Sequence, residues 1–382
     1  MMKPAPWGAE VLRTLQNAGF LAYAVGGCVR DCLLGRQPMD WDIATSALPQ
    51  QIMSLFSRTV ATGLKHGTVT VLIDSKPVEV TTFRKEGAYS DCRRPDEVIY
   101  TDLPEEDAAR RDFTINALYW DGYDTILDFF GGKQDLERKV IRTVGEGSKR
   151  FSEDALRILR CARFSAQLGF EVSESTKSAM REKADLLQYI SRERIGEEWE
   201  KILMSDPIKG FSILWETGCH TVTDCRINAT KEEWQRCADL PFDAIVRWAA
   251  LLWNSYDVRE ILKHFRRDKK TISRCVWLTE QKNKDLSTDY ALKRLVADSS
   301  EEAVEQLTEI RQDIKERFCT IKNREGFVTM NNLALTGEMM LRTGLYTGRE
   351  IGEAREWLLD QVLLGHVSNN SANLTKKLTE KR

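Results

Sequence analysis

Long apolar segments are missing from this chain. No stretch approaches the roughly 18 consecutive apolar residues that a membrane-spanning helix needs. The opening "MMKPAPWGAE" also lacks the apolar run of a signal peptide. We therefore expect a cytoplasmic protein with no membrane partner. The 382 residues, 42% of them hydrophobic, are enough to bury a large core in more than one domain.

Paired cysteine motifs and histidine clusters are also lacking. The nine cysteines form no C-x-x-C pair and the chain has only four histidines, so we expect neither a disulfide framework nor a zinc site. Cys28 and Cys32 have helical i, i+4 spacing, but packing explains two isolated thiols better than metal binding. The motifs G-x-x-x-x-G-K-[ST] and G-x-G-x-x-G are absent too, which leaves P-loop and dinucleotide-binding folds without support.

A large excess of charge of one sign is the last missing feature. The net charge is only −2, so DNA is not an expected partner and any nucleic-acid surface must be a local patch. The segment "KHFRRDKKTISR", residues 263–274, is a dense basic stretch that either follows an RNA backbone or is simply solvated. Its cations are Lys263, Arg266, Arg267, Lys269, Lys270 and Arg274.

The chain does contain a strand-rich first third followed by helices. Residues 21–27, "LAYAVGG", predict a strand that ends at paired glycines, and "CVRDCLLG" then has helical spacing. The segments "DWDIAT", "GTVTVLI" and "KPVEVTTF" predict three further strands, with a turn at Asp74 and Ser75 between the last two. From about residue 146 amphipathic helical segments such as "RIGEEWEKILM" replace the strand signals.

These patterns predict an α+β fold with a small mixed β-sheet head and a mostly α-helical neck, body and tail. We place the head at residues 1–145, the neck at 146–205, the body at 206–320 and the tail at 321–382.

The segment "MDWDIAT" places two acids, Asp40 and Asp42, two positions apart. In a strand their carboxylates would share one face, while Trp41 and Ile43 would enter the core on the other. Adjacent carboxylates repel unless a hard divalent cation such as Mg²⁺ neutralises them. The alternative is a solvated edge strand whose acids guard against aggregation.

The segment "GGCVRD" precedes the acid pair. Gly26 and Gly27 end the strand and begin the helix, a geometry in which backbone N–H groups can approach a phosphate. Arg30, near the start of that helix, can neutralise a triphosphate. Paired glycines alone are a weak signal, but followed by the acid pair they indicate a nucleotide with bound metal.

The segment "EDALRILRCARF" can read a base. On a helix Asp154 and Arg157 are i, i+3 neighbours, so an acceptor and a fork of donors would face one spot. Cytosine and adenine offer an exocyclic amine to the acid and a ring nitrogen to the arginine. Guanine and uracil present a carbonyl there instead, and would leave polar groups unpaired. The alternative is a solvated helix on which Glu153, Asp154 and the arginines form ordinary salt bridges.

A set of motifs resembles a known family. They are "AVGGCVRDCLLGRQPMDWDIAT", "EVTTFR", "RRDFTINAL", "DFFGGKQDL", "RTVGE" and "RFSEDALRILRCARFSAQLGF", which span residues 22–170. Together they look like the bacterial CCA-adding tRNA nucleotidyltransferases of class II, in the polymerase-β-like superfamily. The segment "LALTGEMMLRTGLYTGREIGEAREWLLDQVLLGHV" is similar to the family's tail, whereas residues 206–320 match only in helical character.

The resemblance implies template-independent addition of C, C and A to the 3′ end of tRNA. CTP and ATP would be the substrates, pyrophosphate the product, and nucleotidyl transfer would depend on two metal ions. By the same resemblance Asp40 and Asp42 hold Mg²⁺, Glu79 is a third catalytic acid, and Asp154 and Arg157 select the base. The remaining nucleotide-binding residues that it implies are Gly26, Gly27, Arg30, Arg111, Asp112, Asn116, Arg160 and Arg163.

Residues 84–98, "RKEGAYSDCRRPDEV", read as a mobile loop beside the site. In the family such a loop accompanies the switch from C to A addition, so its presence favours full CCA activity over CC-only activity. An A-only enzyme and a poly(A) polymerase stay open as alternatives. Two further alternatives are an RNA-binding protein with a degenerate head and a small-molecule nucleotidyltransferase, which would lack the "EDALR" helix. Because no His-Asp dipeptide occurs, we expect no phosphohydrolase domain.

Overall fold

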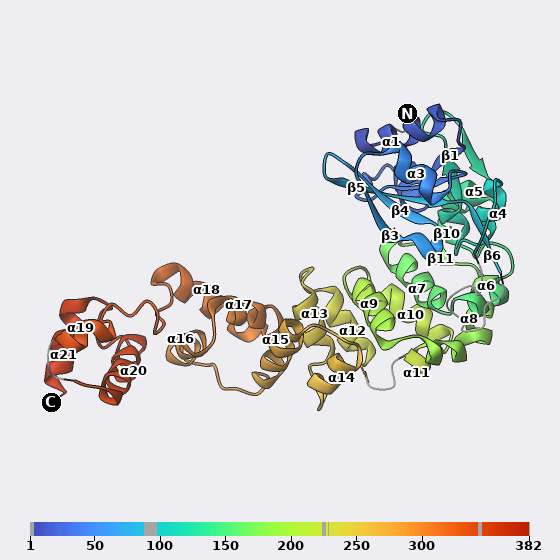
Figure 1. The fold of residues 1–382 in the computed structure, drawn as a ribbon. Coiled ribbons are helices and arrows are strands. Elements are labelled where there is room, and N and C mark those ends of the chain that lie inside the picture. Colours follow the sequence, from blue (N-terminus) through green and yellow to red (C-terminus); the bar gives the residue numbers. More distant parts are fainter. Residues whose placement is uncertain (1–3, 88–97, 224–226, 228, 343–345, 382) are drawn as a thin grey trace. The chain divides into compact units, whose positions relative to one another are not determined.

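The computed structural model describes residues 4–87, 98–223, 227, 229–342 and 346–381 (Figure 1). The chain divides into two compact units, Met1–Asn228 and Ala229–Arg382. The described part of the first unit contains a mixed β-sheet and helices, and that of the second consists of helices and their connections. The predicted α+β fold is therefore confirmed. The finer division into head, neck, body and tail stays a prediction.

A seven-stranded sheet with strand order β3-β4-β5-β2-β1-β8-β9 forms the centre of the first unit. Adjacent strands run antiparallel, except that β2 and β5 are parallel. The strands are β1 (Ala22–Val25), β2 (Asp42–Thr45), β3 (Thr59–Gly63), β4 (Thr68–Ile73), β5 (Lys76–Thr82), β8 (Leu118–Trp120) and β9 (Ile126–Asp128). The parallel pairing places β2, the strand of the acid pair, directly beside β5.

The hairpin of β4 and β5 follows from local sequence. Val69 and Val71 of β4 and Val78 and Val80 of β5 are fully buried. Burial of every second residue is the pattern of strands with one face in the core. Asp74 and Ser75 have φ values of 48° and 64°, the left-handed conformation that a two-residue hairpin turn requires. The predicted turn is therefore confirmed at the predicted residues.

Three helices pack against the sheet. Helix α1 (Pro6–Asn17) contacts β1, β2 and β5, α2 (Gly27–Leu33) contacts β1 and β8, and α3 (Pro49–Leu55) contacts β4 and β5. Trp41, only 2% exposed, lies close under α1. A Cβ atom at Gly8 would come within 2.9 Å of its ring, so the absence of a side chain there lets α1 cover the start of β2.

Further helices and short strands complete the first unit. Helix α7 (Leu156–Leu168) packs against α9 (Arg192–Leu203) and α10 (Pro207–Glu216), and α6 (Gly147–Glu153) packs against α8 (Glu174–Lys183). Strand β6 (Arg84–Glu86) pairs with β7 (Val98–Tyr100), and β10 (Val140–Ile141) pairs with β11 (Glu171–Val172). The helices are α4 (Pro104–Ala109), α5 (Gly132–Arg138), α6 (Gly147–Glu153), α7 (Leu156–Leu168), α8 (Glu174–Lys183), α9 (Arg192–Leu203), α10 (Pro207–Glu216) and α11 (His220–Thr223), with 3₁₀ turns η1 (Leu64–His66), η2 (Thr114–Asn116) and η3 (Ala184–Tyr189).

The second unit is built from capped helices. The side chains of Asp243, Asp257 and Asp268 each accept a backbone N–H at a helix start, which satisfies donors that the helix leaves unpaired. The helices are α12 (Lys231–Ala238), α13 (Ala244–Leu251), α14 (Val258–His264), α15 (Lys269–Glu280), α16 (Asp289–Asp298), α17 (Glu301–Ile310), α18 (Gln312–Arg324), α19 (Gly337–Arg342), α20 (Arg349–Leu363) and α21 (Ser371–Glu380). None of the helices in the described ranges is long and apolar enough to span a membrane.

Candidate active site

The acid pair lies at the start of the central strand β2. Trp41 and Ile43 are buried and Asp40 and Asp42 are exposed, so the predicted alternation is present. The strand itself begins at Asp42, however, and Asp40 belongs to the bend before it. The observed strand is therefore shorter than the predicted one. Only from Asp42 onward does the chain pair with a strand on each side, β1 and β5.

Glu79 stands beside Asp42 in the sheet. The two residues are directly opposite each other in the parallel pairing of β2 and β5, and residues in register project from the same face. Asp42 keeps solvent access, yet the surrounding protein removes much of its hydration. This loss of hydration, followed by repulsion from Glu79, raises the pKa of Asp42 to about 6; Arg111 opposes the rise and Asp40 adds to it. A carboxylate with unneutralised acids beside it is a suitable ligand for a divalent cation.

The turn between β1 and α2 brings an arginine close to these acids. Gly26 has φ 74° and ψ −136°, a conformation that glycine adopts far more readily than other residues. A Cβ atom there would lie 3.6 Å from Asp42 Oδ2 and 3.5 Å from Arg111 Nη1. Gly27 is equally close to Arg30, with its Cβ position 3.5 Å from Arg30 Nη2. The predicted glycines, acid and arginines are therefore neighbours in space.

Arg111 is held by a buried acid. Its Nε donates to the Tyr119 hydroxyl at 2.9 Å, and its Nη2 lies 3.3 Å from Asp107 Oδ2. Asp107 is fully buried, and Tyr119 donates its hydroxyl proton to it. Burial would raise the pKa of Asp107, but Arg110 and Arg111 outweigh that effect and lower it. Arg111 is thereby fixed between this buried carboxylate and the exposed acids.

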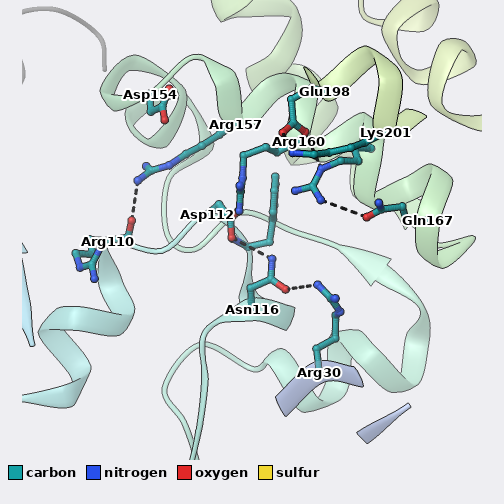
Figure 2. Close-up of polar contacts among 12 residues, drawn as sticks. Arg30, Arg110, Asp112, Asn116, Asp154, Arg157, Arg160, Gln167, Glu198 and Lys201 are labelled. Carbon is teal, nitrogen blue, oxygen red and sulfur yellow. Dashed lines mark hydrogen bonds and ion pairs between the residues drawn. The ribbon is translucent and has the colours of Figure 1, made fainter. Parts of the chain in front are cut away.

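A continuous row of hydrogen bonds joins helix α2 to helix α7 (Figure 2). Arg30 Nη1 donates to Asn116 Oδ1 at 2.8 Å, and Asn116 Nδ2 donates to Asp112 Oδ1 at 3.1 Å. Arg160 then donates to Asp112 Oδ2 through both Nε and Nη2, at 2.9 Å and 2.6 Å. Although burial opposes ionisation of Asp112, Arg160 outweighs it and lowers the pKa to about 2. Four predicted site residues therefore form one connected network.

The helix expected to carry Asp154 and Arg157 is broken. Asp154 has φ −141° and ψ 102° and lies between α6 and α7, whereas Arg157 lies in the first turn of α7. The i, i+3 arrangement on one helix was therefore wrong. The physical reason is that the Asp154 side chain accepts the N–H of Leu156 at 3.1 Å, and a short acid that bonds nearby backbone favours helix starts over helix interiors.

Arg157 is anchored next to Asp154 (Figure 2). It donates through Nη1 to Glu153 Oε2 at 2.9 Å and to the Arg150 carbonyl at 3.1 Å, and through Nη2 to the Arg110 carbonyl at 2.8 Å. These contacts use three of the five N–H donors of a guanidinium. The protein itself therefore holds Arg157 in one orientation.

The comparisons with known proteins fit this geometry. A family model described as "Poly A polymerase head domain" matches residues 22–142, and one described as "Probable RNA and SrmB- binding site of polymerase A" matches residues 169–222. A CCA-adding enzyme of Lactobacillus delbrueckii subsp. bulgaricus is 35% identical over 381 residues, which cover 96% of this chain and 96% of that enzyme. This chain belongs to the CCA-adding enzymes.

Two other CCA-adding enzymes are also similar. That of Geobacillus thermodenitrificans is 46% identical over 249 residues, covering 65% of this chain and 60% of that protein. The crystal structure of the Bacillus stearothermophilus CCA-adding enzyme in complex with CTP has a TM-score of 0.83 and 32% identity, and covers 98% of this chain and 96% of that chain. The family's fold therefore extends over both units of this chain.

Analysis of the sequence did not identify two residues of α9 that contact candidate site residues of this CCA-adding enzyme. Arg194 pairs with both carboxylate oxygens of Asp154, at 3.0 Å and 3.4 Å, and Glu198 pairs with Arg163 at 2.6 Å. Arg163 also donates to Gln167 at 3.3 Å. A signal for Glu198 was available, because it shares the apolar face of α9 with Ile195 and Ile202, where a charge calls for a partner.

The exposed acids have the chemistry of an open site for a divalent metal ion. In the described part of the chain no group of three His, Cys, Asp or Glu side chains forms a ready metal-binding cluster. Asp40 and Asp42 instead offer exposed carboxylate oxygens, with Glu79 beside them. Mg²⁺ favours such sites, because it keeps several positions for water and substrate phosphates. The donor set therefore fits a divalent cation that is completed by a nucleotide.

Two predicted regions lie outside this network. Residues 88–97 of the expected mobile loop are outside the described residues, and only the flanking strands β6 and β7 are seen to pair. The basic segment belongs to the second unit, where Lys263, Arg266, Lys269 and Lys270 are exposed and Arg267 is half-buried. Arg274 contacts α17, at 3.4 Å from Glu302 and 3.1 Å from Gln306. An RNA-binding role for the basic segment stays a prediction.

Proposed function

We propose that this chain adds C, C and A to the 3′ end of tRNA, using CTP and ATP and releasing pyrophosphate. The 3′-hydroxyl attacks the α-phosphate of the bound nucleotide as the bond to pyrophosphate breaks. The observation that carries the proposal is the single network in the first unit. Asp42 stands opposite Glu79 of β5 and close to the turn at Gly26, while Arg30 connects through Asn116 and Asp112 to Arg160 of α7.

Asp40 and Asp42 are the proposed ligands of two divalent cations, with Glu79 as the supporting acid. Metal bound there supplies Lewis-acid chemistry and neutralises phosphate charge. Arg30, Arg111, Arg160 and Arg163 bind the triphosphate, since guanidinium groups match phosphate oxygens in geometry and charge. The glycines Gly26 and Gly27 allow the phosphates to approach the backbone.

Asp112 and Asn116 are proposed to bind the ribose. Both are buried and already share a hydrogen bond, so their positions are fixed before the sugar arrives. Asp154 accepts the exocyclic amine of cytosine or adenine, and Arg157 donates to the ring nitrogen. Arg194 contacts both carboxylate oxygens of Asp154 and so holds that side chain in one orientation. Because Asp154 is acceptor-only when ionised, a guanine or uracil carbonyl facing it would be left unpaired.

The second unit is proposed to hold the tRNA. Duplex RNA is recognised mainly by shape and backbone, because its major groove is too narrow for side chains to read. The exposed cations of the basic segment suit phosphate contacts.

The decisive experiment supplies a tRNA that ends at position 73, with Mg²⁺ and one nucleotide at a time. We expect CTP alone to add two residues, and ATP to add one residue only after the two cytidines. Extension by A alone on a CC-ended tRNA only, or a long A tail on any RNA, would replace this proposal by A-only or poly(A) activity. Binding of tRNA without extension would indicate a degenerate RNA-binding protein.

A further inference from the structure

Three guanidinium groups surround a single aromatic ring at the heart of this network. The Cζ atoms of Arg30, Arg160 and Arg163 lie 5.2, 5.5 and 4.1 Å from the centroid of the Phe164 ring. All three distances are within the roughly 6 Å at which a cation is attracted to a ring. Arg160 and Arg163 precede Phe164 on the same helix, whereas Arg30 comes to the ring from α2.

The ring is fixed in place by its own packing. Phe164 is 5% exposed and packs edge-to-face against Phe113, with centroids 5.8 Å apart and an interplanar angle of 83°. Phe113 is fully buried. The arginines come from two separate elements, Arg30 from α2 and the other two from α7. Phe164 is therefore the point at which Arg30, distant in the chain, meets Arg160 and Arg163 of Phe164's own helix.

Contact with a ring does something that contact with a carboxylate does not. A carboxylate uses the in-plane N–H donors of a guanidinium, as Asp112 does with Arg160. An aromatic ring attracts the cation without accepting a conventional hydrogen bond from it. Arginine has about 2 kcal/mol of rotamer entropy to lose when it is ordered. A ring that restricts the arginines in advance reduces this cost while keeping donors available for phosphate oxygens.

We propose that Phe164 is a positioning residue that gathers Arg30, Arg160 and Arg163 by contact with their guanidinium groups and presents them to the triphosphate of the incoming nucleotide. This inference rests on the proposed function. It assigns a role in nucleotide binding to a side chain that itself touches no phosphate.

The test changes the electrostatics of the ring but barely its shape. Phenylalanine with one, two or three ring fluorines is placed at position 164, which weakens the negative face of the ring stepwise. We expect the Kd for CTP, measured by calorimetry with the full-length protein, to rise with each fluorine and by about tenfold overall, since three weak contacts are lost together. The KM for CTP should rise in parallel, with kcat and the KM for tRNA changed less than twofold.

Two further variants separate positioning from packing. Trifluorophenylalanine at Phe151, a fully buried ring of α6, is the matched control and should leave the Kd for CTP unchanged. Phe164→Leu should raise the Kd at least as much as the trifluoro ring. If fluorination at 164 leaves the Kd for CTP unchanged while Phe164→Leu only lowers the unfolding temperature, Phe164 is a core residue and this inference is wrong. The proposed function fails separately, if the wild-type protein adds no nucleotide to tRNA.

Discussion

At the scale of single residues, the charge that would let Asp42 bind a metal ion also lowers the stability of the metal-free fold. In the metal-free protein, loss of hydration and the neighbouring acids raise its pKa to about 6, so its ionised form is disfavoured in the folded state. An aspartate in an unfolded chain has a pKa of about 3.9. The folded state therefore loses stability as the pH rises from about 4 through about 6, and the full stabilisation is present only below that interval.

Replacement of Asp42 by asparagine should expose this balance. At pH 7 without metal we expect Asp42→Asn to unfold at a higher temperature than the wild type, because the disfavoured charge is gone. The difference should shrink as the pH is lowered and vanish near pH 4. Nucleotide addition should fall by at least about 100-fold, since even residues behind metal ligands are worth 10–100-fold. Thermal unfolding by circular dichroism between pH 4 and 7 and a CTP-incorporation assay measure the two effects.

Asp124→Asn is the matched control, because Asp124 is an exposed acid of the same unit. It should change neither the unfolding temperature nor the activity. Mg²⁺ should raise the unfolding temperature of the wild type and of this control more than that of Asp42→Asn. If Asp42→Asn unfolded at a lower temperature than the wild type at pH 7, the charge on Asp42 would not destabilise the metal-free protein. That result would count against a metal site.

At the scale of elements, the outcome of sequence prediction depended on how local the determining contacts are. The turn at Asp74 and Ser75 was predicted correctly because a two-residue hairpin turn depends on its own dihedral angles. The break at Asp154 was missed because the apolar periodicity continues across it, and a single side-chain bond to the Leu156 N–H decides the conformation. Periodicity reports a buried face and does not show where one helix ends and the next begins.

Partners contributed by distant elements could not be predicted in the same way. The sequence identified Asp42 and Glu79 as acids, but only the parallel pairing of β2 and β5 puts them opposite each other. Likewise Asp112 and Arg160 were both named without any sign that they bind each other. Such pairings depend on how the whole chain folds, and one sequence carries no direct record of them.

Helix α9 should influence base choice through its contact with Asp154. Arg194→Met removes the partner of both Asp154 oxygens, so we expect Asp154 to lose its fixed orientation. Incorporation of U relative to C should rise by about 5- to 10-fold, the equivalent of one lost hydrogen bond of about 1 kcal/mol. Single-nucleotide extension of tRNA with CTP or UTP measures this ratio.

Arg181→Met is the control for this prediction. Arg181 is an exposed arginine of α8 whose Nε donates to the Glu216 carbonyl at 3.4 Å. This control makes the same change in side chain within the first unit, and should leave the U-to-C ratio unaltered. An unaltered ratio in Arg194→Met as well would mean that Asp154 needs no support from α9 to select the base.

At the scale of the whole molecule, the two units divide the proposed work. The network of acids and arginines belongs entirely to the first unit, whereas the basic segment belongs to the second. A chain with a net charge of −2 has no general attraction for RNA, so binding must depend on local cations such as these. The two contributions should therefore be separable by mutation.

The triple variant Lys263→Gln, Lys269→Gln, Lys270→Gln should weaken tRNA binding without affecting CTP. Each phosphate contact that is lost lowers the slope of log K against log salt by about 0.7–0.9, so loss of all three should lower it by about 2 to 3. Fluorescence titration of labelled tRNA between 50 and 200 mM salt measures the slope. The KM for CTP should stay within twofold of the wild type.

An equal loss of charge elsewhere in the second unit provides the comparison. Lys282→Gln, Lys284→Gln, Lys315→Gln removes three lysines from outside the basic segment and should leave the slope unchanged. If both triple variants lower the slope equally, the effect is one of overall charge. If neither lowers it, the basic segment is a solvated surface.

The close packing of Gly132, the first residue of helix α5, bears on how sequence variants of this enzyme are interpreted. Gly132 carries no catalytic group, yet a Cβ atom there would lie only 2.2 Å from the carbonyl oxygen of Thr114. Thr114 begins the 3₁₀ turn that ends at Asn116. Even an alanine allele at position 132 would therefore have to displace that turn. We therefore expect such an allele to weaken the ribose contacts proposed for Asn116, although position 132 itself carries no functional group.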